Sequence, residues 1–264
     1  MDICELNNNP NWREQRHPWE RARVKVIADM LKGTFGKKTS SLHILDIGSG
    51  DAYMVYELTR IFPELKVHCI DIEYTPEIKA ELMKQIGDAN ISLYDSQDEY
   101  KLANPNFSPD IILLLDVIEH IEDDKGFLKA LISQDVIDSK TKVLITVPAH
   151  QSLFSAHDVF LKHFRRHTVS TLLKTLEVCN LKSLKSGYFF FSLVSARYIQ
   201  KRLNIGNDEK AQKGISSYKP VFLVDKLIYS TLLLDYHFFK GLRSLGIRGS
   251  GLSCYTICQQ KQES

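Results

Sequence analysis

The sequence predicts an α/β fold: a Rossmann-like, mostly parallel sheet with helices on both of its faces. Apolar runs of strand length alternate with helix-like segments at intervals of about 20–25 residues up to Pro148, which is typical of parallel βαβ units. These runs are nearly continuous in apolar residues, as expected for strands buried on both faces. A glycine-rich turn follows the first run and opens an amphipathic segment, the place where such sheets bind ligands.

The composition is that of a folded globular protein. The chain has 264 residues, of which 44% are hydrophobic and 25% charged, enough for one large domain. Its 34 basic and 32 acidic side chains give a net charge of +2, which argues against broad contact with nucleic acid. The five cysteines form no CxxC pair, the first residues are polar, and no apolar run reaches about 18 residues. We therefore expect a cytoplasmic protein without a signal peptide or a membrane-spanning helix.

The first segment, residues 1–36, is expected to form a polar arm followed by a helix. Pro18–Lys32 can place Trp19 and four aliphatic side chains on one helical face, and Gly33 is a helix-ending signal. Such a helix can simply cover an edge of the sheet. Alternatively, Trp19, Arg21 and Arg23 help to close the cofactor or substrate site.

Residues 37–148 contain five predicted strands. They cover residues 42–47, 66–72, 91–94, 110–116 and 142–147. The helices predicted between them cover residues 54–62, 76–86 and 127–132.

The regular alternation stops after Pro148. Residues 149–167 contain four His, two Arg and one Asp, too polar a composition for a buried segment. The elements predicted after it are a helix at 169–179, a strand at 183–191, a helical insertion at 192–249 and a last strand at 252–259 within residues 250–264. The insertion holds two helix-like stretches, 193–203 and 220–245, around a charged loop at 204–217.

The turn Gly48-Ser49-Gly50 lets a ligand approach the backbone closely, because glycine has no Cβ. A dinucleotide-binding protein would carry GxGxxG, but the sixth position here is Tyr53. Asp46 stands two residues before the first glycine, where its charge would repel a pyrophosphate. A carboxylate beside such a turn can instead recognise the ammonium group of S-adenosylmethionine. We therefore expect Asp46, Gly48, Ser49 and Gly50 to bind S-adenosylmethionine.

Three further acids follow the next three strands. Asp71, 21 residues after Gly50, can accept hydrogen bonds from ribose hydroxyls. Asp95, or Asp98 because the strand is short, can accept one from the adenine amine, and Asp116 lies at the ligand-binding edge of the sheet. One such acid alone would be read as a helix cap or a turn former, but acids after four successive strands favour a ligand site. Two adjoining residues, Ile72 and Ser96, belong to the predicted cofactor site.

The segments LDIGSGDAY, CIDI, YDS, PDIILLLDVIEHIEDD and VLITVPA, in this order, resemble class I S-adenosylmethionine-dependent methyltransferases over roughly residues 42–148. The resemblance implies a seven-stranded sheet whose last strand runs antiparallel. It also implies donor contacts at the acids and glycines named above and at Val117. Many members have a third glycine where this chain has Ala52, which is small enough to keep the site.

We expect a single domain. Its donor-binding half covers residues 37–148, and its acceptor-side half covers residues 149–191. The segment VPAHQSLFSAHD…HFRRHT, with the upstream HPWERAR helix, is similar to a bacterial subgroup of these enzymes. Members of this subgroup commonly occur among proteins of glycan and lipid biosynthesis. The resemblance therefore implies a reaction type but says little about the acceptor.

Candidate acceptor-side residues lie after the fourth and fifth strands. A hydroxyl acceptor benefits from a general base, for which we consider His120 and His157, with Asp158 as the group that orients a ring. Arg165 and Arg166 can hold a carboxylate or phosphate, and Trp19 is a further candidate for acceptor contact. Structural hydrogen bonds and surface salt bridges are the alternatives for these residues. No HxH or HExxH spacing supports a metal site, so we expect none.

Residues 221–243 are dense in leucine and aromatic side chains. Such a helix can form a lid over the active site, pack between the last strands, or contact a membrane surface or a lipid acceptor.

The donor motifs, the resemblance and the acceptor-side residues together predict a methyltransferase that acts, at oxygen, on a small-molecule, glycan or lipid-linked acceptor. The alternative is a catalytically inactive protein of the same fold that binds or regulates a partner.

Overall fold

The computed structural model describes residues 16–105, 107–202, 221–247 and 249–261, whose strands form one seven-stranded sheet. The strand order is β3-β2-β1-β4-β5-β7-β6. The strands are β1 (His43–Ile47), β2 (Lys66–Ile70), β3 (Ile91–Tyr94), β4 (Ile111–Leu115), β5 (Lys142–Pro148), β6 (Leu181–Phe189) and β7 (Ser253–Gln260). The first five are parallel, and β7 runs antiparallel to both β5 and β6. The predicted Rossmann-like sheet with an antiparallel last strand is therefore confirmed.

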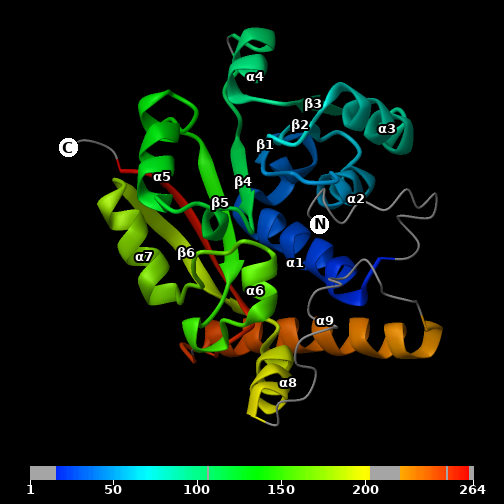
Figure 1. Ribbon diagram of the computed structural model, residues 1–264, viewed down its shortest axis with the longest axis vertical. Coiled ribbons are helices and arrows are strands. Elements are labelled where there is room, and N and C mark those ends of the chain that lie inside the picture. Colours follow the sequence, from blue (N-terminus) through cyan, green and yellow to red (C-terminus); the bar gives the residue numbers. More distant parts are fainter. Residues whose placement is uncertain (1–15, 106, 203–220, 248, 262–264) are drawn as a thin grey trace.

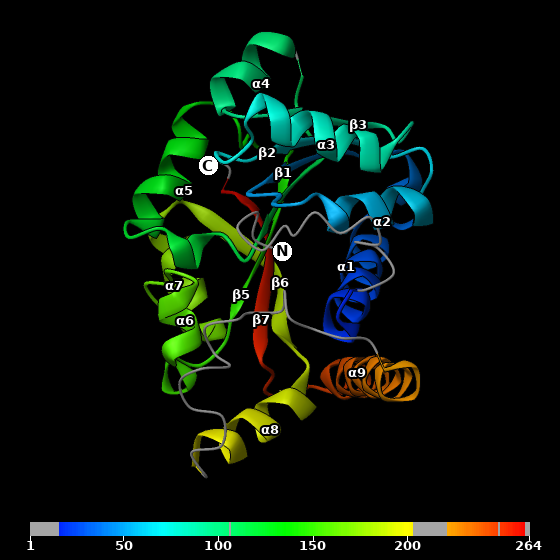
Figure 2. The ribbon, with the colours of Figure 1, turned by 45° about the vertical axis from the view of Figure 1, so that its right-hand side comes forward.

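Helices cover both faces of this sheet, as Figure 2 shows with the sheet seen nearly edge-on. One face carries α1 (Pro18–Phe35), α2 (Tyr53–Ile61), α3 (Pro76–Ile86) and α9 (Phe222–Ser244). The other carries α4 (Gln97–Ala103), α5 (Asp124–Ser133) and α7 (Val169–Val178). The short helix α6 (Ala156–Phe160) and the helix α8 (Phe191–Arg202) belong to the segments that follow β5 and β6. Two separate apolar clusters, one on each face, form the core.

Two predictions about helices were wrong. Gly33 does not end α1, which continues to Phe35 and ends at Gly36 with φ 59°. A single glycine costs a helix only about 1 kcal/mol, and buried Val26 and Leu31 hold α1 against the core. The sequence also gave no sign of α4, whose seven residues include charged side chains and only one that is fully buried.

The long helix α9 packs on α1 (Figure 1). Tyr236 Oη donates a hydrogen bond to Asp29 Oδ2 at 2.6 Å, and Lys240 Nζ forms an ion pair with the same oxygen at 2.6 Å. The outer side of α9, with the residue that caps its end, exposes a row of apolar side chains at helical spacing: Leu223, Leu227, Leu234, Phe238 and Leu245. Among the described residues, no helix combines the length and hydropathy needed to cross a lipid bilayer. The predicted charged loop at 204–217 lies outside the described residues.

Candidate donor and acceptor site

The glycine turn joins β1 to α2 and is held against the ends of two other strands. Gly48 and Gly50 both have positive φ, 72° and 55°. The N–H groups of Gly48 and Ser49 donate to Ile70 O, at the end of β2, at 2.8 and 3.3 Å. A Cβ added to Gly48 would lie 2.7 Å from Val117 Cγ2, just beyond β4. The turn therefore requires glycine at position 48, both for its φ and for this close approach.

Ala52, at the N-cap of α2, also has a positive φ of 55° and is fully buried. Glycine adopts this conformation without strain, whereas for an L-residue with a Cβ it costs about 1–2 kcal/mol of conformational free energy. The turn thus keeps its left-handed conformation at the position where many methyltransferases have a third glycine.

Asp71 and Tyr74 hold the turn from the side of β2. Asp71 Oδ2 accepts a hydrogen bond from the Gly50 N–H at 2.8 Å. Tyr74 Oη lies 2.7 Å from both Gly50 O and Ser49 Oγ, a contact the sequence did not reveal. Ile72, next to Asp71, is 92% exposed, although isoleucine is usually buried. An apolar side chain left open at this edge suits contact with a planar base.

Asp46 sits at the centre of this edge with an unsatisfied oxygen. The residue is 2% exposed, and Oδ1 has no hydrogen-bond partner among the described residues. Burial, followed by the charge of Asp71, raises the pKa of Asp46 to about 7. A buried carboxylate oxygen without a partner is costly, and a cationic ligand group would satisfy it.

Helix α1 reaches across to the ends of β4 and β5. Arg23 Nη1 forms an ion pair with Asp116 Oδ2 at 2.8 Å, and Arg23 Nη2 donates to Thr146 Oγ1 at 2.8 Å. The guanidinium also lies 5.2 Å from the centre of the Trp19 ring, whose Nε1 is buried without a partner in the described part of the chain. Arg23 thus links α1 to Asp116, whereas Arg21 lies over the ring of Tyr229, and a role of this helix in closing the site stays a prediction.

The start of α1 is tied to the glycine turn by a buried ion pair that the sequence analysis did not identify. Arg16 contacts Asp51, the residue after the last glycine of the turn. It also pairs with Glu20 at 3.0 Å and lies over the ring of Tyr53 at 4.3 Å. All three charged groups of this set are buried, so the first residues of the described chain are fixed over the turn.

The residues after β3 have local partners in this structure. Asp95 is exposed, pairs with Lys79 Nζ at 3.2 Å, and donates its N–H to Glu99 Oε2 at 2.6 Å. Ser96 caps α4 by accepting a hydrogen bond from the Glu99 N–H at 3.2 Å. Asp98 lies in the first turn of α4. Contact of Asp95 and Ser96 with an adenine stays a prediction.

The segments after β4 and β5 meet at a backbone hydrogen bond. The Phe164 N–H donates to Glu119 O at 2.8 Å, which joins the segment after β5 to the 3-10 helix η3 (Ile118–His120). The rings of His120 and His163 lie edge to face as a result, with centroids 4.5 Å apart. Glu119 itself is fully buried, and burial, with the nearby charge of Asp116, raises its pKa well above the usual value.

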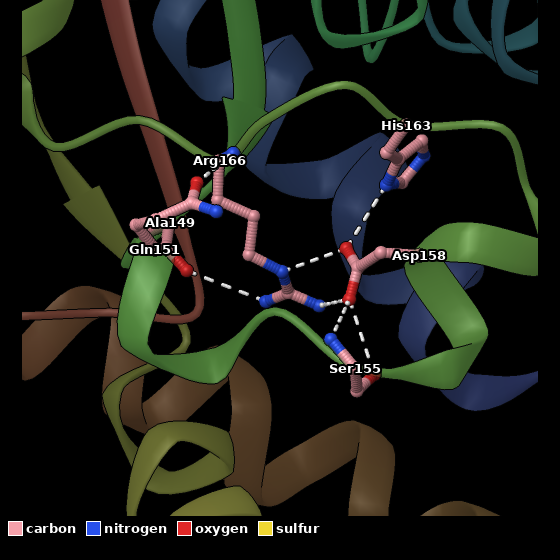
Figure 3. A network of polar contacts seen from close by, with 6 residues as sticks. All are labelled: Ala149, Gln151, Ser155, Asp158, His163 and Arg166. Atoms are coloured by element: carbon pink, nitrogen blue, oxygen red, sulfur yellow. Dashed lines mark hydrogen bonds and ion pairs between the residues drawn. The ribbon is translucent and has the colours of Figure 1, made fainter.

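Asp158 is the centre of a polar network in the segment after β5 (Figure 3). Its Oδ1 lies 3.0 Å from His163 Nδ1 and 2.7 Å from Arg166 Nε. Its Oδ2 accepts from Arg166 Nη2 at 3.0 Å and from the Ser155 N–H at 2.9 Å. Burial alone would raise the pKa of Asp158, but the hydrogen bonds from His163 and Arg166 outweigh it and lower the pKa. Asp158 therefore carries a charge and orders this segment.

The other predicted acceptor residues lie close by. Arg165 pairs with Asp124 at 3.0 Å and donates to Glu122 O at 2.5 Å. Arg165 and Arg166 thus both help to hold the segment after β5 in place. His157 is half-buried on α6, one residue before Asp158. Acceptor contact by Arg165 or Arg166, and proton transfer at His120 or His157, stay predictions.

A family model described as a methyltransferase domain matches residues 13–213. No curated protein sequence gives a significant match to the chain. Several hundred solved structures share its fold, and three illustrate their range. A candidate sarcosine dimethylglycine methyltransferase from Galdieria sulphuraria superposes with a TM-score of 0.53 at 16% identity, over 90% of this chain and 85% of that one.

The second structure is the plantazolicin methyltransferase BpumL in complex with a substrate analogue and SAH. It has a TM-score of 0.53 at 15% identity, over 96% of this chain and 88% of that one. The third is the [4+2]-cyclase SpnF, with a TM-score of 0.50 at 10% identity, over 90% of this chain and 81% of that one. Identities this low establish a shared fold, and the fold alone does not fix the reaction.

Proposed function

The chain belongs to the methyltransferase domain family, and we propose that it methylates a hydroxyl oxygen of a small-molecule, glycan or lipid-linked acceptor. Its cofactor is S-adenosylmethionine. The single observation that carries the donor assignment is the glycine turn with the buried, unpaired oxygen of Asp46 beside it.

The residues at this edge fit the donor part by part. Asp46 would bind the ammonium group, since its Oδ1 is buried and no described residue pairs with it. Gly48 and Gly50 would let the methionine portion lie against the backbone. Asp71 would accept from the ribose hydroxyls, and the exposed Ile72 would lie against the adenine. Three further residues, Asp95, Ser96 and Val117, complete this proposed site.

In this reaction the main task of the protein is to align the acceptor oxygen with the methyl group of the donor. The bound donor supplies a methyl carbon already activated by the sulfonium charge, so little further activation is needed on that side. The chain has to orient the acceptor oxygen, exclude water and find a destination for the hydroxyl proton. His120 and His157 are the proposed proton acceptors, and Trp19, Asp158, Arg165 and Arg166 are the proposed residues around the acceptor.

Calorimetric titration of the full chain with S-adenosylmethionine tests the donor assignment. We expect saturable binding that weakens at least tenfold in Asp46→Asn. A folded protein that binds no donor at about 1 mM would contradict the proposal. Radiolabelled methyl transfer to hydroxyl-, amine- and thiol-bearing acceptors then tests the preference for oxygen. Donor binding without transfer to any acceptor class would favour the inactive binding protein.

A lipid-linked acceptor is supported by the apolar outer side of α9. Leu227 and Leu234 are 68% and 71% exposed on this helix, and Lys226, also exposed, can meet anionic headgroups. Co-sedimentation with vesicles containing phosphatidylglycerol should fall in the double variant Leu227→Gln/Leu234→Gln. Leu102→Gln is the matched control, because Leu102 is 86% exposed on α4. Equal sedimentation of all three proteins would exclude this surface as the contact.

A further inference from the structure

Three potential metal-binding side chains meet where the segments after β4 and β5 join. They are Glu119, His120 and His163, and one ligand atom from each lies within 4.8 Å of the other two. The hydrogen bond from the Phe164 N–H to Glu119 O holds the two segments together at this point. The ligands are thus placed by the backbone and do not depend on flexible side chains alone.

The carboxylate of Glu119 is unsatisfied in this position. The residue is 0% exposed, and neither of its oxygens has a hydrogen-bond partner within the described residues. A buried carboxyl group without partners is unfavourable whether it is ionised or protonated. A bound cation would satisfy both oxygens at once.

His163 has the supporting contact that metal-bound histidines usually have. Its Nδ1 lies 3.0 Å from Asp158 Oδ1, and Asp158 is itself fixed by Arg166 and Ser155. Asp158 Oδ1, which also accepts from Arg166 Nε, is placed to accept the His163 Nδ1–H, so Nε2 is the ring nitrogen left for a metal. A carboxylate behind a histidine fixes the ring and its tautomer for binding a metal through the other nitrogen.

We infer that Glu119, His120 and His163 bind one divalent transition-metal ion. Two imidazoles and one carboxylate favour ions such as Zn²⁺, Mn²⁺ or Co²⁺ over Mg²⁺ or Ca²⁺, which prefer oxygen ligands. Ligand atoms about 2.0–2.2 Å from one ion lie roughly 3–4 Å from each other. The three ligand atoms of this cluster lie within 4.8 Å of one another, so small side-chain movements bring them to these separations. Three protein ligands leave at least one position open for an exogenous oxygen.

The open position has a role in the proposed oxygen methylation, on which this part of the inference rests. The acceptor hydroxyl would coordinate the ion, which lowers its pKa, and its proton would pass to solvent. The oxygen would then form a bond to the methyl carbon while the carbon–sulfur bond breaks, and its electron pair would stay on sulfur. His120 acts here as a ligand, and the ion takes over the activation of the hydroxyl.

The positions of the three ligands along the chain explain why the sequence did not indicate the site. Glu119 and His120 are adjacent on η3, whereas His163 lies after the next strand, so no HxH or HExxH spacing arises. Only the folded chain brings them together.

Equilibrium dialysis of the chelator-treated full chain against Zn²⁺, Mn²⁺ and Co²⁺ tests the inference. We expect about one ion per chain, and visible absorption bands for the Co²⁺ form that report nitrogen and oxygen ligands. Glu119→Gln and His163→Gln should each weaken binding at least tenfold. Both changes keep the size and polarity of the side chain, and circular dichroism verifies folding. His150→Gln is the control, because His150 lies on the same segment but bonds Ser250 at 2.7 Å.

Two results would overturn the metal site: no ion bound by the wild-type chain, or equal binding by wild type and by both ligand variants. Titration of the same samples with S-adenosylmethionine separates this inference from the proposed function. Donor binding by a chain that binds no ion overturns the metal site and leaves methyl transfer standing. Ion binding by a folded chain that binds no donor supports the metal site and contradicts the proposed function.

Discussion

Asp46 carries a carboxylate oxygen that is buried in the sheet, just before the glycine turn, and has no partner in the part of the chain that the structure describes. Its pKa of about 7 in the folded chain lies well above the value of about 3.9 expected after unfolding. Between these two values the folded state keeps a proton that the unfolded state has released. The stability contribution of Asp46 therefore falls as the pH rises from about 4 to about 7.

The variant Asp46→Asn removes this effect. Without donor, we expect it to be more stable than wild type at pH 8 by a few kcal/mol, and close to wild type at pH 4. Urea unfolding at both pH values measures the difference. The donor titration of the same variant should show weaker binding. A variant that loses stability at pH 8 would show that Asp46 already has a compensating partner.

Gly48 combines a positive φ of 72° with a close approach to Val117. Gly48→Ala should destabilise the chain by about 2–4 kcal/mol, because the left-handed conformation costs about 1–2 and the overlap with Val117 a similar amount. A double-mutant cycle with Val117→Ala isolates the overlap. We expect a favourable coupling of about 1 kcal/mol or more between the two changes, measured by urea unfolding. Zero coupling would mean that only φ matters.

At the scale of elements, the segment after β5 depends on a buried ion pair. Asp158 is 0% exposed and bonds Arg166 through both oxygens. Removing one partner of such a pair costs about 3–5 kcal/mol, which is the loss we expect for Arg166→Met. Arg165→Met is the matched neighbour, and its more exposed pair with Asp124 should cost about 1 kcal/mol or less. Equal losses of unfolding free energy in the two variants would contradict this assignment.

Strongly patterned elements could be predicted from the sequence. β3 has the predicted bounds, β1 and β5 differ from theirs by one residue at one end, and β4 and β7 differ by one residue at both ends. β2 ends two residues early, and β6 is shifted by two residues. Short polar helices could not be predicted, since α4 and α6 have too few apolar residues to show a period. The capping box of Ser155 and Asp158 was the one local signal for α6.

Some residues of the candidate site could likewise be predicted from the sequence, and others could not. The places of Gly48 and Asp71 just after strands, and of Asp46 near the end of β1, could be predicted from the apolar runs, whereas their contacts with a donor stay predictions. Glu119 and Arg16 could not, because their importance comes from contacts with residues far along the chain. Tertiary contacts of this kind leave no spacing in the sequence.

At the scale of the whole molecule, a bound donor should stabilise the entire fold. At about 100 times its dissociation constant, S-adenosylmethionine should add about 2.7 kcal/mol of stability and raise Tm by about 5–10 °C. Differential scanning calorimetry measures the shift. The variant Asp71→Asn should show a smaller shift at the same concentration, since Asp71 is a proposed ribose contact. A full shift in this variant would place the ribose elsewhere.

The position of β7 between β5 and β6 also sets an order of events during synthesis. β6 pairs with β7 in the described sheet, yet residues 190–252 separate the two strands in the sequence. A ribosome adds about 5–20 residues per second, so this stretch takes roughly 3–13 s to make. Throughout that interval the apolar edge of β5 and all of β6 lack their partner, and open edges of this kind invite aggregation. The nascent chain therefore depends on rapid completion of synthesis, low temperature or a chaperone during this interval.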